Sequence, residues 1–221
     1  MVGGFTDRTE AVQRVWERIR VECRHSVRTQ VHVPLWDRWK YRCKTGGCLQ
    51  HGFSWDQPTT PCSSCGADLE VAREEARLDL EVRSHGAPRT FFDVTVRHSV
   101  PGNAVRVAAA SNRAGAVATE AENAKKTRYP DGCTPWRCVS LALETCGRHG
   151  LQSLQHLRDL AKAKATLELE EDCAERAAGA LVQRWGAWLS VALHRANAEV
   201  LWSALGPERR AAGDLAEELA R

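Results

Sequence analysis

Apolar and polar residues alternate most regularly over residues 77–97, and this alternation predicts a β-hairpin. Two alternating runs flank the turn-forming segment Ser-His-Gly-Ala-Pro at 84–88. The apolar members lie on one face of the hairpin: Leu78, Leu80, Val82, Phe92, Val94 and Val96. A shorter alternation over 27–33 predicts a half-buried strand, and the largely apolar segment 136–145 predicts a buried one.

Apolar residues at helical spacing predict helices on either side of these strands. We expect a first helix over residues 7–24, one or two over 103–129, and three more over 151–170, 174–204 and 207–220. The order of elements predicts an α/β (α+β) fold whose small mixed sheet is flanked by helices. In this scheme residues 1–150 form the core and residues 151–221 a C-terminal helical extension.

Residues 40–66 interrupt the pattern with a segment rich in Cys, Gly, Pro and Trp, which we expect to be irregular. Four residues separate Cys43 from Cys48, two separate Cys62 from Cys65, and thirteen lie between the pairs. Two close pairs joined by a short loop match the ligand spacing of a tetrahedral structural Zn²⁺. The sequence therefore predicts a zinc knuckle, with His51 as a reserve ligand. The alternative is four incidental thiols in a loop.

Composition and charge indicate where the protein is located and what kind of partner it binds, rather than which reaction it catalyses. The chain has 221 residues, nine cysteines and a net charge of +3, and no apolar run long enough to cross a membrane. The N-terminus has no apolar signal segment, so we expect an intracellular location, with the nucleus as one candidate, and cysteines that bind metal rather than form disulfides. Residues 1–66 carry ten Lys/Arg against six Asp/Glu and residues 105–150 seven against four, whereas residues 67–104 are slightly acidic. Two basic segments around an acidic one suit a nucleic-acid partner, although an ordinary mixed-charge surface has the same pattern.

The polar face of the hairpin carries two carboxylates. With the turn centred near residue 86, Asp79 lies opposite Asp93, and opposite side chains share a face. Two carboxylates so close repel each other unless a divalent cation lies between them, and oxygen ligands suit Mg²⁺ or Mn²⁺. The alternative is a solvated polar face on which Arg77 or Arg97 compensates the charge.

Four short segments in this order carry a resemblance to a known family. They are LDL at 78–80, FFDVTVRH at 91–98, AENAKKTRYP at 121–130 and LALETCGRHG at 141–150. Together they resemble the restriction-like endonuclease of the PD-(D/E)xK type that follows the reverse transcriptase of some non-long-terminal-repeat retroelements. The resemblance spans residues 10–200 and implies a nuclease-like core that acts on DNA.

The resemblance implies a role for particular residues. Asp79 and Asp93 would bind Mg²⁺ or Mn²⁺ with the Val94 carbonyl as a third ligand, and a helix glutamate, Glu17 or Glu22, would complete the shell. The family's lysine falls at Thr95, which cannot neutralise phosphate charge.

Lys125 offers a replacement from the following helix. It shares a helix face with Tyr129, and Lys-x-x-x-Tyr stands where relatives carry Gln-x-x-x-Tyr. The alternative for Lys125 is a solvated position near the helix C-terminus. Two functions follow: a metal-dependent DNA endonuclease, or a zinc-containing nucleic-acid-binding protein on the same fold that has lost catalysis. A third alternative is a scaffold whose C-terminal helices bind a partner helix.

Overall fold

The computed structural model describes residues 3–45, 47–84, 86–98, 112–132 and 135–204. A four-stranded mixed sheet lies at its centre, in the order β1-β5-β6-β7. Strand β5 is antiparallel to both of its neighbours, β1 and β6, whereas β6 and β7 are parallel. The strands are β1 (Ser26–His32), β5 (Arg77–Arg83), β6 (Thr90–Arg97) and β7 (Arg137–Glu144).

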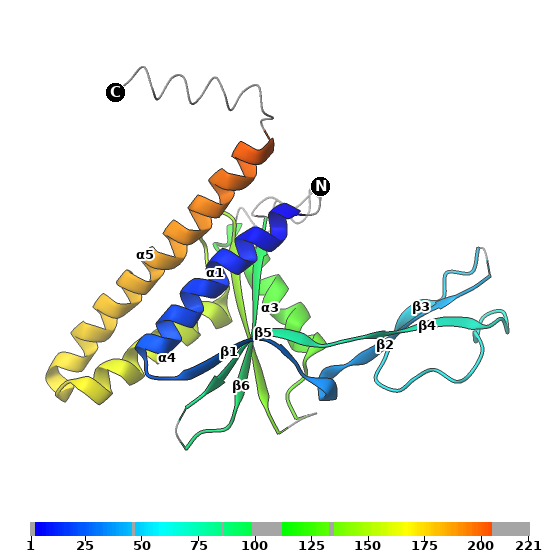
Figure 1. Ribbon diagram of the computed structural model, residues 1–221, viewed down its shortest axis with the longest axis horizontal. Coiled ribbons are helices and arrows are strands. Elements are labelled where there is room, and N and C mark those ends of the chain that lie inside the picture. Colours follow the sequence, from blue (N-terminus) through cyan, green and yellow to red (C-terminus); the bar gives the residue numbers. More distant parts are fainter. Residues whose placement is uncertain (1–2, 46, 85, 99–111, 133–134, 205–221) are drawn as a thin grey trace.

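Helices cover both faces of this sheet (Figure 1). The first face packs against α1 (Gly3–Glu22), α4 (Leu151–Glu168) and α5 (Glu171–Ala204). The second face packs against α3 (Ala116–Arg128), whose Ala118 and Ala121 contact Ala142 of β7. The expected mixed α+β architecture with a small sheet between helices is therefore confirmed.

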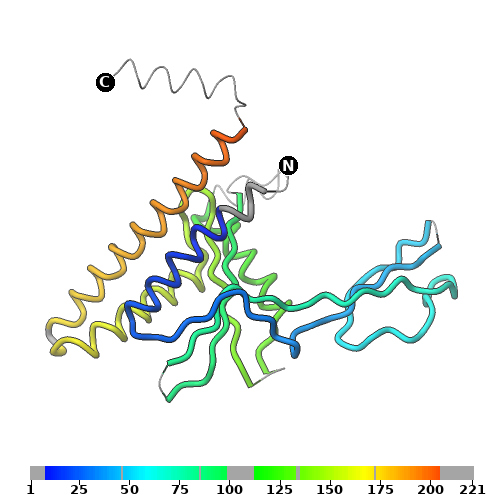
Figure 2. Tube along the Cα trace, in the orientation of Figure 1, coloured from blue at the N-terminus to red at the C-terminus, as the bar shows by residue number. Residues whose placement is uncertain are grey.

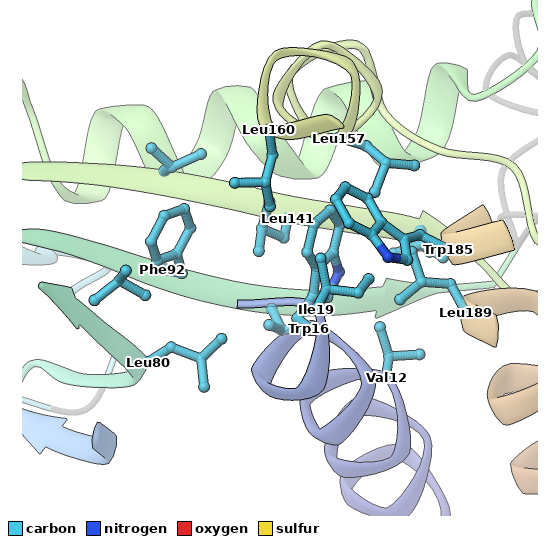
Figure 3. Close-up of a cluster of buried hydrophobic side chains, with 14 of the residues drawn as sticks. Val12, Trp16, Ile19, Leu80, Phe92, Leu141, Leu157, Leu160, Trp185 and Leu189 are labelled. Atoms are coloured by element: carbon cyan, nitrogen blue, oxygen red, sulfur yellow. The ribbon is translucent and has the colours of Figure 1, made fainter. Parts of the chain in front are cut away.

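One large cluster of buried side chains joins the sheet to three helices (Figure 3). Trp16 and Ile19 of α1 and Trp185 of α5 are fully buried in it, together with Phe92 of β6 and Leu157 of α4. Most of the buried side chains that the sheet contributes to this cluster come from the hairpin face predicted to be apolar. Because α4 and α5 complete this core, the described part of 151–221 is integral to it rather than appended to a finished domain.

The segment between β1 and β5 differs from its expected form. It contains a short 3-10 helix (Pro34–Trp36) and three strands, β2 (Arg38–Cys43), β3 (His51–Ser54) and β4 (Leu69–Glu74). These strands form a second antiparallel sheet in the order β3-β2-β4. The expectation of an irregular insert over 40–66 holds for residues 44–45, 47–50 and 55–66 but was wrong for 40–43 and 51–54, which are strands. Together, residues 38–74 form an arm that stands away from the core (Figures 1 and 2).

Strand β4 was missed because Leu69–Glu74 alternates without burying an apolar face. Its order comes from backbone pairing with β2 instead. Of the helices expected over 103–129, α3 is described and residues 99–111 lie outside the described part. The helix expected over 207–220 also lies outside it.

Candidate functional sites

Four cysteines meet at the far end of the arm, beside the last residue pair of β2 and β4, Cys43 and Leu69. The sulfurs of Cys43, Cys48, Cys62 and Cys65 all lie within 4.8 Å of one another. Sγ of Cys43 is 3.4 Å from that of Cys65, and Sγ of Cys48 is 3.6 Å from that of Cys62. Tetrahedral zinc with Zn–S bonds of about 2.3 Å needs sulfurs about 3.8 Å apart. The predicted cluster is therefore assembled, and it could hold a structural metal such as zinc.

The loop that carries Cys62 and Cys65 is a tight, hydrogen-bonded turn. The Cys62–Cys65 turn closes with hydrogen bonds from the Gly66 N–H to the Cys62 carbonyl and from the Cys62 N–H to the Ala67 carbonyl, both 2.8 Å. Gly66 has a φ of +73°, which only glycine adopts readily. The Ala67 N–H and then the neighbouring thiols lower the pKa of Cys65, whereas, against the opposing Gln50 N–H, the Cys62 thiol raises the pKa of Cys48.

His51, the reserve ligand, does not join the cluster. It is exposed, and its Nδ1 lies 2.8 Å from the Leu49 carbonyl oxygen. Among the described residues, the four thiols alone therefore make up the candidate ligand set.

The second site lies on the main sheet, where the hairpin carboxylates meet. Leu80 pairs with Phe92 and Val82 with Thr90, a register that sets Asp79 opposite Asp93 as expected. The regular pairing stops at Leu80. Beyond it the Val94 N–H donates to Asp79 Oδ2 at 2.6 Å, so the carboxylate replaces a backbone acceptor where the strands separate.

The Asp79 carboxyl lies in an environment that disfavours its charge. Burial, with the Asp93 charge as the second cause, raises the pKa of Asp79 to about 6. The Val94 N–H, Lys125 and Gln30 oppose this increase in the pKa. A divalent cation between the carboxylates would remove the cost, because it stabilises both charges at once.

Lys125 reaches this site from α3. Its Nζ lies 2.8 Å from Asp93 Oδ2, and the Lys125 side chain is 29% exposed against 7% for Asp93. The Thr95 hydroxyl donates to Asp93 Oδ1 at 3.3 Å. The structure therefore brings Asp79, Asp93, Thr95 and Lys125 together from three elements.

Glu22 does not take the place expected for it, whereas Tyr129 stays beside Lys125, whose Nζ lies 6.0 Å from the Tyr129 ring centroid. The Tyr129 ring is buried in a second cluster, where its centroid lies 5.6 Å from that of Trp36. Burial, and next the Asp93 charge, raise the pKa of the Tyr129 hydroxyl, which keeps it neutral. Glu22 pairs with Arg184 and accepts a hydrogen bond from Trp185 Nε1, so it serves the helix interface instead.

Glu17 shares with Asp79 a groove of about 630 Å³ between α1 and the sheet, and Asp93 does not line this groove. The groove is lined by polar residues of α1, β1 and β5: Thr9, Glu10, Gln13, Arg14, Glu17, Thr29, Gln30 and Asp79. Sequence reasoning missed Gln13 and Gln30, which both bond to Asp79. The sequence signal for Gln30 was its place on the polar side of the alternation over 27–33.

Two motif glutamates have structural roles. Buried Glu122 accepts the N–H groups of Gln152 and Ser153 at 2.9 and 2.8 Å, and so caps the start of α4. Buried Glu144 accepts the Val117 N–H at 3.0 Å at the start of α3. Two residues of the segments that carry the family resemblance therefore hold helix N-termini and take no part in the carboxylate site.

The carboxylate site can offer a cation the side chains of Asp79 and Asp93. In the part of the chain that the structure describes, no third acidic or histidine side chain closes on Asp79 and Asp93 as tightly as the four cysteines close on one another. Water would therefore fill the remaining positions of a hard cation such as Mg²⁺.

Comparison with models of known protein families found no match, and comparison with curated proteins found no similar sequence. None of the described helices combines the length and apolar character needed to cross a membrane.

Proposed function

We propose that this protein is a divalent-metal-dependent DNA endonuclease with a PD-(D/E)xK-type core and a structural Zn²⁺ in its arm. One observation carries the proposal: Lys125 Nζ contacts Asp93, which lies opposite Asp79 where β5 and β6 separate. A cation and a cationic side chain at one carboxylate pair are what phosphodiester hydrolysis requires.

Each residue has a defined task in this proposal. Asp79, Asp93 and the Val94 carbonyl would hold Mg²⁺ or Mn²⁺, which activates a water and neutralises charge on the attacked phosphate. Lys125, which is partly exposed, would contact the same phosphate and supply the charge that Thr95 lacks. The helix before β1 and the order of β1, β5, β6, α3 and β7 support this assignment, because they are the elements the family core contains.

The arm supports nucleic acid as the partner. Arg38, Lys40 and Arg42 alternate along β2 and so project to one face of the arm sheet. Arg38 and Arg42 pair with Glu74 and Glu70, whereas Phe53 on the same face is half exposed under the Arg38 guanidinium. Cations next to an exposed ring suit both phosphates and bases.

The second candidate function is a zinc-containing nucleic-acid-binding protein that has lost catalysis. Thr95 favours it, because the strand position that carries lysine in the family holds only a hydroxyl bonded to Asp93. The two candidates share the arm and the partner, so only cleavage separates them.

Asp93→Asn provides the test. With Mg²⁺ or Mn²⁺, wild-type protein should cleave single- or double-stranded DNA, and Asp93→Asn should abolish cleavage while DNA binding stays equal or becomes tighter. Loss of one negative charge weakens the metal site and also reduces repulsion of phosphates. Asp159→Asn, an exposed change on α4, is the matched control and should retain both activities.

If wild-type protein binds DNA but cleaves no substrate with either metal, the non-catalytic function replaces the nuclease. If Asp93→Asn lowers binding and cleavage together in proportion to folded protein, Asp93 is structural.

A further inference from the structure

Gln30 has an unusual backbone conformation for a residue in a strand. Its φ is +51°, and among the described residues only Arg24 shares a positive φ without being glycine. The left-handed region costs an ordinary residue about 1–2 kcal/mol. A strained residue of this kind persists only where the surrounding structure holds it.

The strain coincides with a rotation of two strands. Val27 of β1 packs in the main cluster with Leu80 of β5, whereas Val31 and Leu78 pack in the second cluster with Phe91. Residues two apart in a strand normally share a face. Both strands therefore turn over between these residues, in the row where Gln30 lies beside Asp79.

Hydrogen bonds connect this row to α1. The Gln30 amide nitrogen donates to Asp79 Oδ1 and to Gln13 Oε1, each at 3.3 Å. The Gln13 amide nitrogen donates to the Asp79 backbone carbonyl at 3.2 Å. Gln13 is 7% exposed, so it is a buried anchor for the more exposed Gln30.

We infer that Gln30, braced by Gln13, is a positioning residue that holds the Asp79 carboxylate in the orientation that binds the divalent cation. The Val94 N–H holds Oδ2 and the Gln30 amide holds Oδ1, so the carboxylate cannot rotate about its Cβ–Cγ bond without losing both bonds. The inference rests on the proposed function, because it needs a cation at Asp79. It explains why the chain keeps a strained residue at this position.

Gln30→Gly separates positioning from stability. Glycine adopts a positive φ without penalty, so the variant should unfold at the same temperature as wild type or a higher one. It lacks the amide, and Mn²⁺ affinity measured by electron paramagnetic resonance on zinc-loaded protein should fall about tenfold, as is typical when a ligand loses its supporting hydrogen bond. A purely structural Gln30 would leave Mn²⁺ affinity unchanged.

Arg24→Gly is the matched control, because it relieves the same left-handed strain at an exposed position after α1. It should preserve Mn²⁺ affinity. Gln13→Met tests the brace and should weaken Mn²⁺ binding less than Gln30→Gly. Equal affinity in wild type and Gln30→Gly, with binding still lost in Asp93→Asn, overturns the inference and leaves the proposed function intact.

Nuclear magnetic resonance of the zinc-loaded protein without Mn²⁺ tests the hydrogen bonds between the two glutamines and Asp79 directly. The side-chain NH₂ resonances of Gln30 and Gln13, assigned by their loss in the single variants, should shift in Asp79→Asn. If they do not shift, the amide connection is absent and the inference fails. The resonances could instead shift while Asp93→Asn binds Mn²⁺ as well as wild type does. The hydrogen bonds to Asp79 would then exist without a metal site, and this result overturns both the metal-positioning role and the proposed catalysis.

Discussion

Replacing Cys62 by serine should remove zinc from the arm and unfold the arm alone. Cys62 is 2% exposed and its sulfur lies 3.6 Å from that of Cys48. A serine hydroxyl is a poor zinc ligand, and three remaining thiols leave an open position. The expected result is loss of the one zinc per chain that metal analysis should find in wild type.

The magnitude follows from how little else holds the arm. Among the described residues of 38–74, the only buried apolar side chains are those of Cys43 and Cys62. Ordering a residue costs about 1–2 kcal/mol of backbone entropy, whereas burying a large apolar side chain returns about 1.5–3 kcal/mol. Structural zinc contributes about 10–16 kcal/mol, so the three-stranded sheet should not persist without it.

The core should remain folded, because its main cluster contains no arm residue. Hydrogen exchange should therefore show fast amides in β2, β3 and β4 of Cys62→Ser and protected amides in β5, β6 and β7. Cys173→Ser, at an exposed thiol outside the cluster, is the control and should keep its zinc. Metal-free wild-type protein with protected arm amides would refute the reasoning.

Three further predictions concern charge. Lys125→Ala should lower the cleavage rate about 100-fold, as loss of one preorganised charge commonly does. The control Lys126→Ala, at an exposed position, should leave the rate unchanged, and equal rates for the two variants would contradict the role of Lys125. Nucleic-acid affinity should fall with salt with a log–log slope of about −4 if about four phosphates are neutralised, and a flat response would exclude this partner. Burial, and then the charge of Arg20, lower the pKa of His156 to about 3, so this histidine stays neutral in the native state while the unfolded chain takes up a proton below about pH 6.5. Its contribution to stability is complete above that pH and is lost as the pH falls toward 3, with a loss of about 2 kcal/mol by pH 5. Urea unfolding of wild type and His156→Gln at pH 7 and pH 5 should show this difference, and equal pH dependence would contradict it.

The sequence by itself determined the hairpin and its register. Alternation with a period of two is local, and a short turn leaves few ways to pair the strands, so Asp79 opposite Asp93 followed from spacing alone. The cysteine spacing was equally local, because each pair lies within one turn. The elements with a strong apolar face were likewise found, with small differences at their ends.

Only the tertiary structure decided the contacts between distant segments. The arm sheet has no apolar periodicity, and its order depends on backbone pairing and on four thiols from two loops. Lys125 and Asp93 are 32 residues apart, and helical spacing shows which face Lys125 occupies but not what that face meets.

Gln30 illustrates the same limit most clearly. Its place in the alternation beside Val31 predicts a strand residue. Its left-handed φ arises where β1 and β5 rotate together and where Gln13 of α1 accepts a hydrogen bond from the Gln30 amide. No local pattern specifies such a conformation, because its cost is offset by contacts from two other elements.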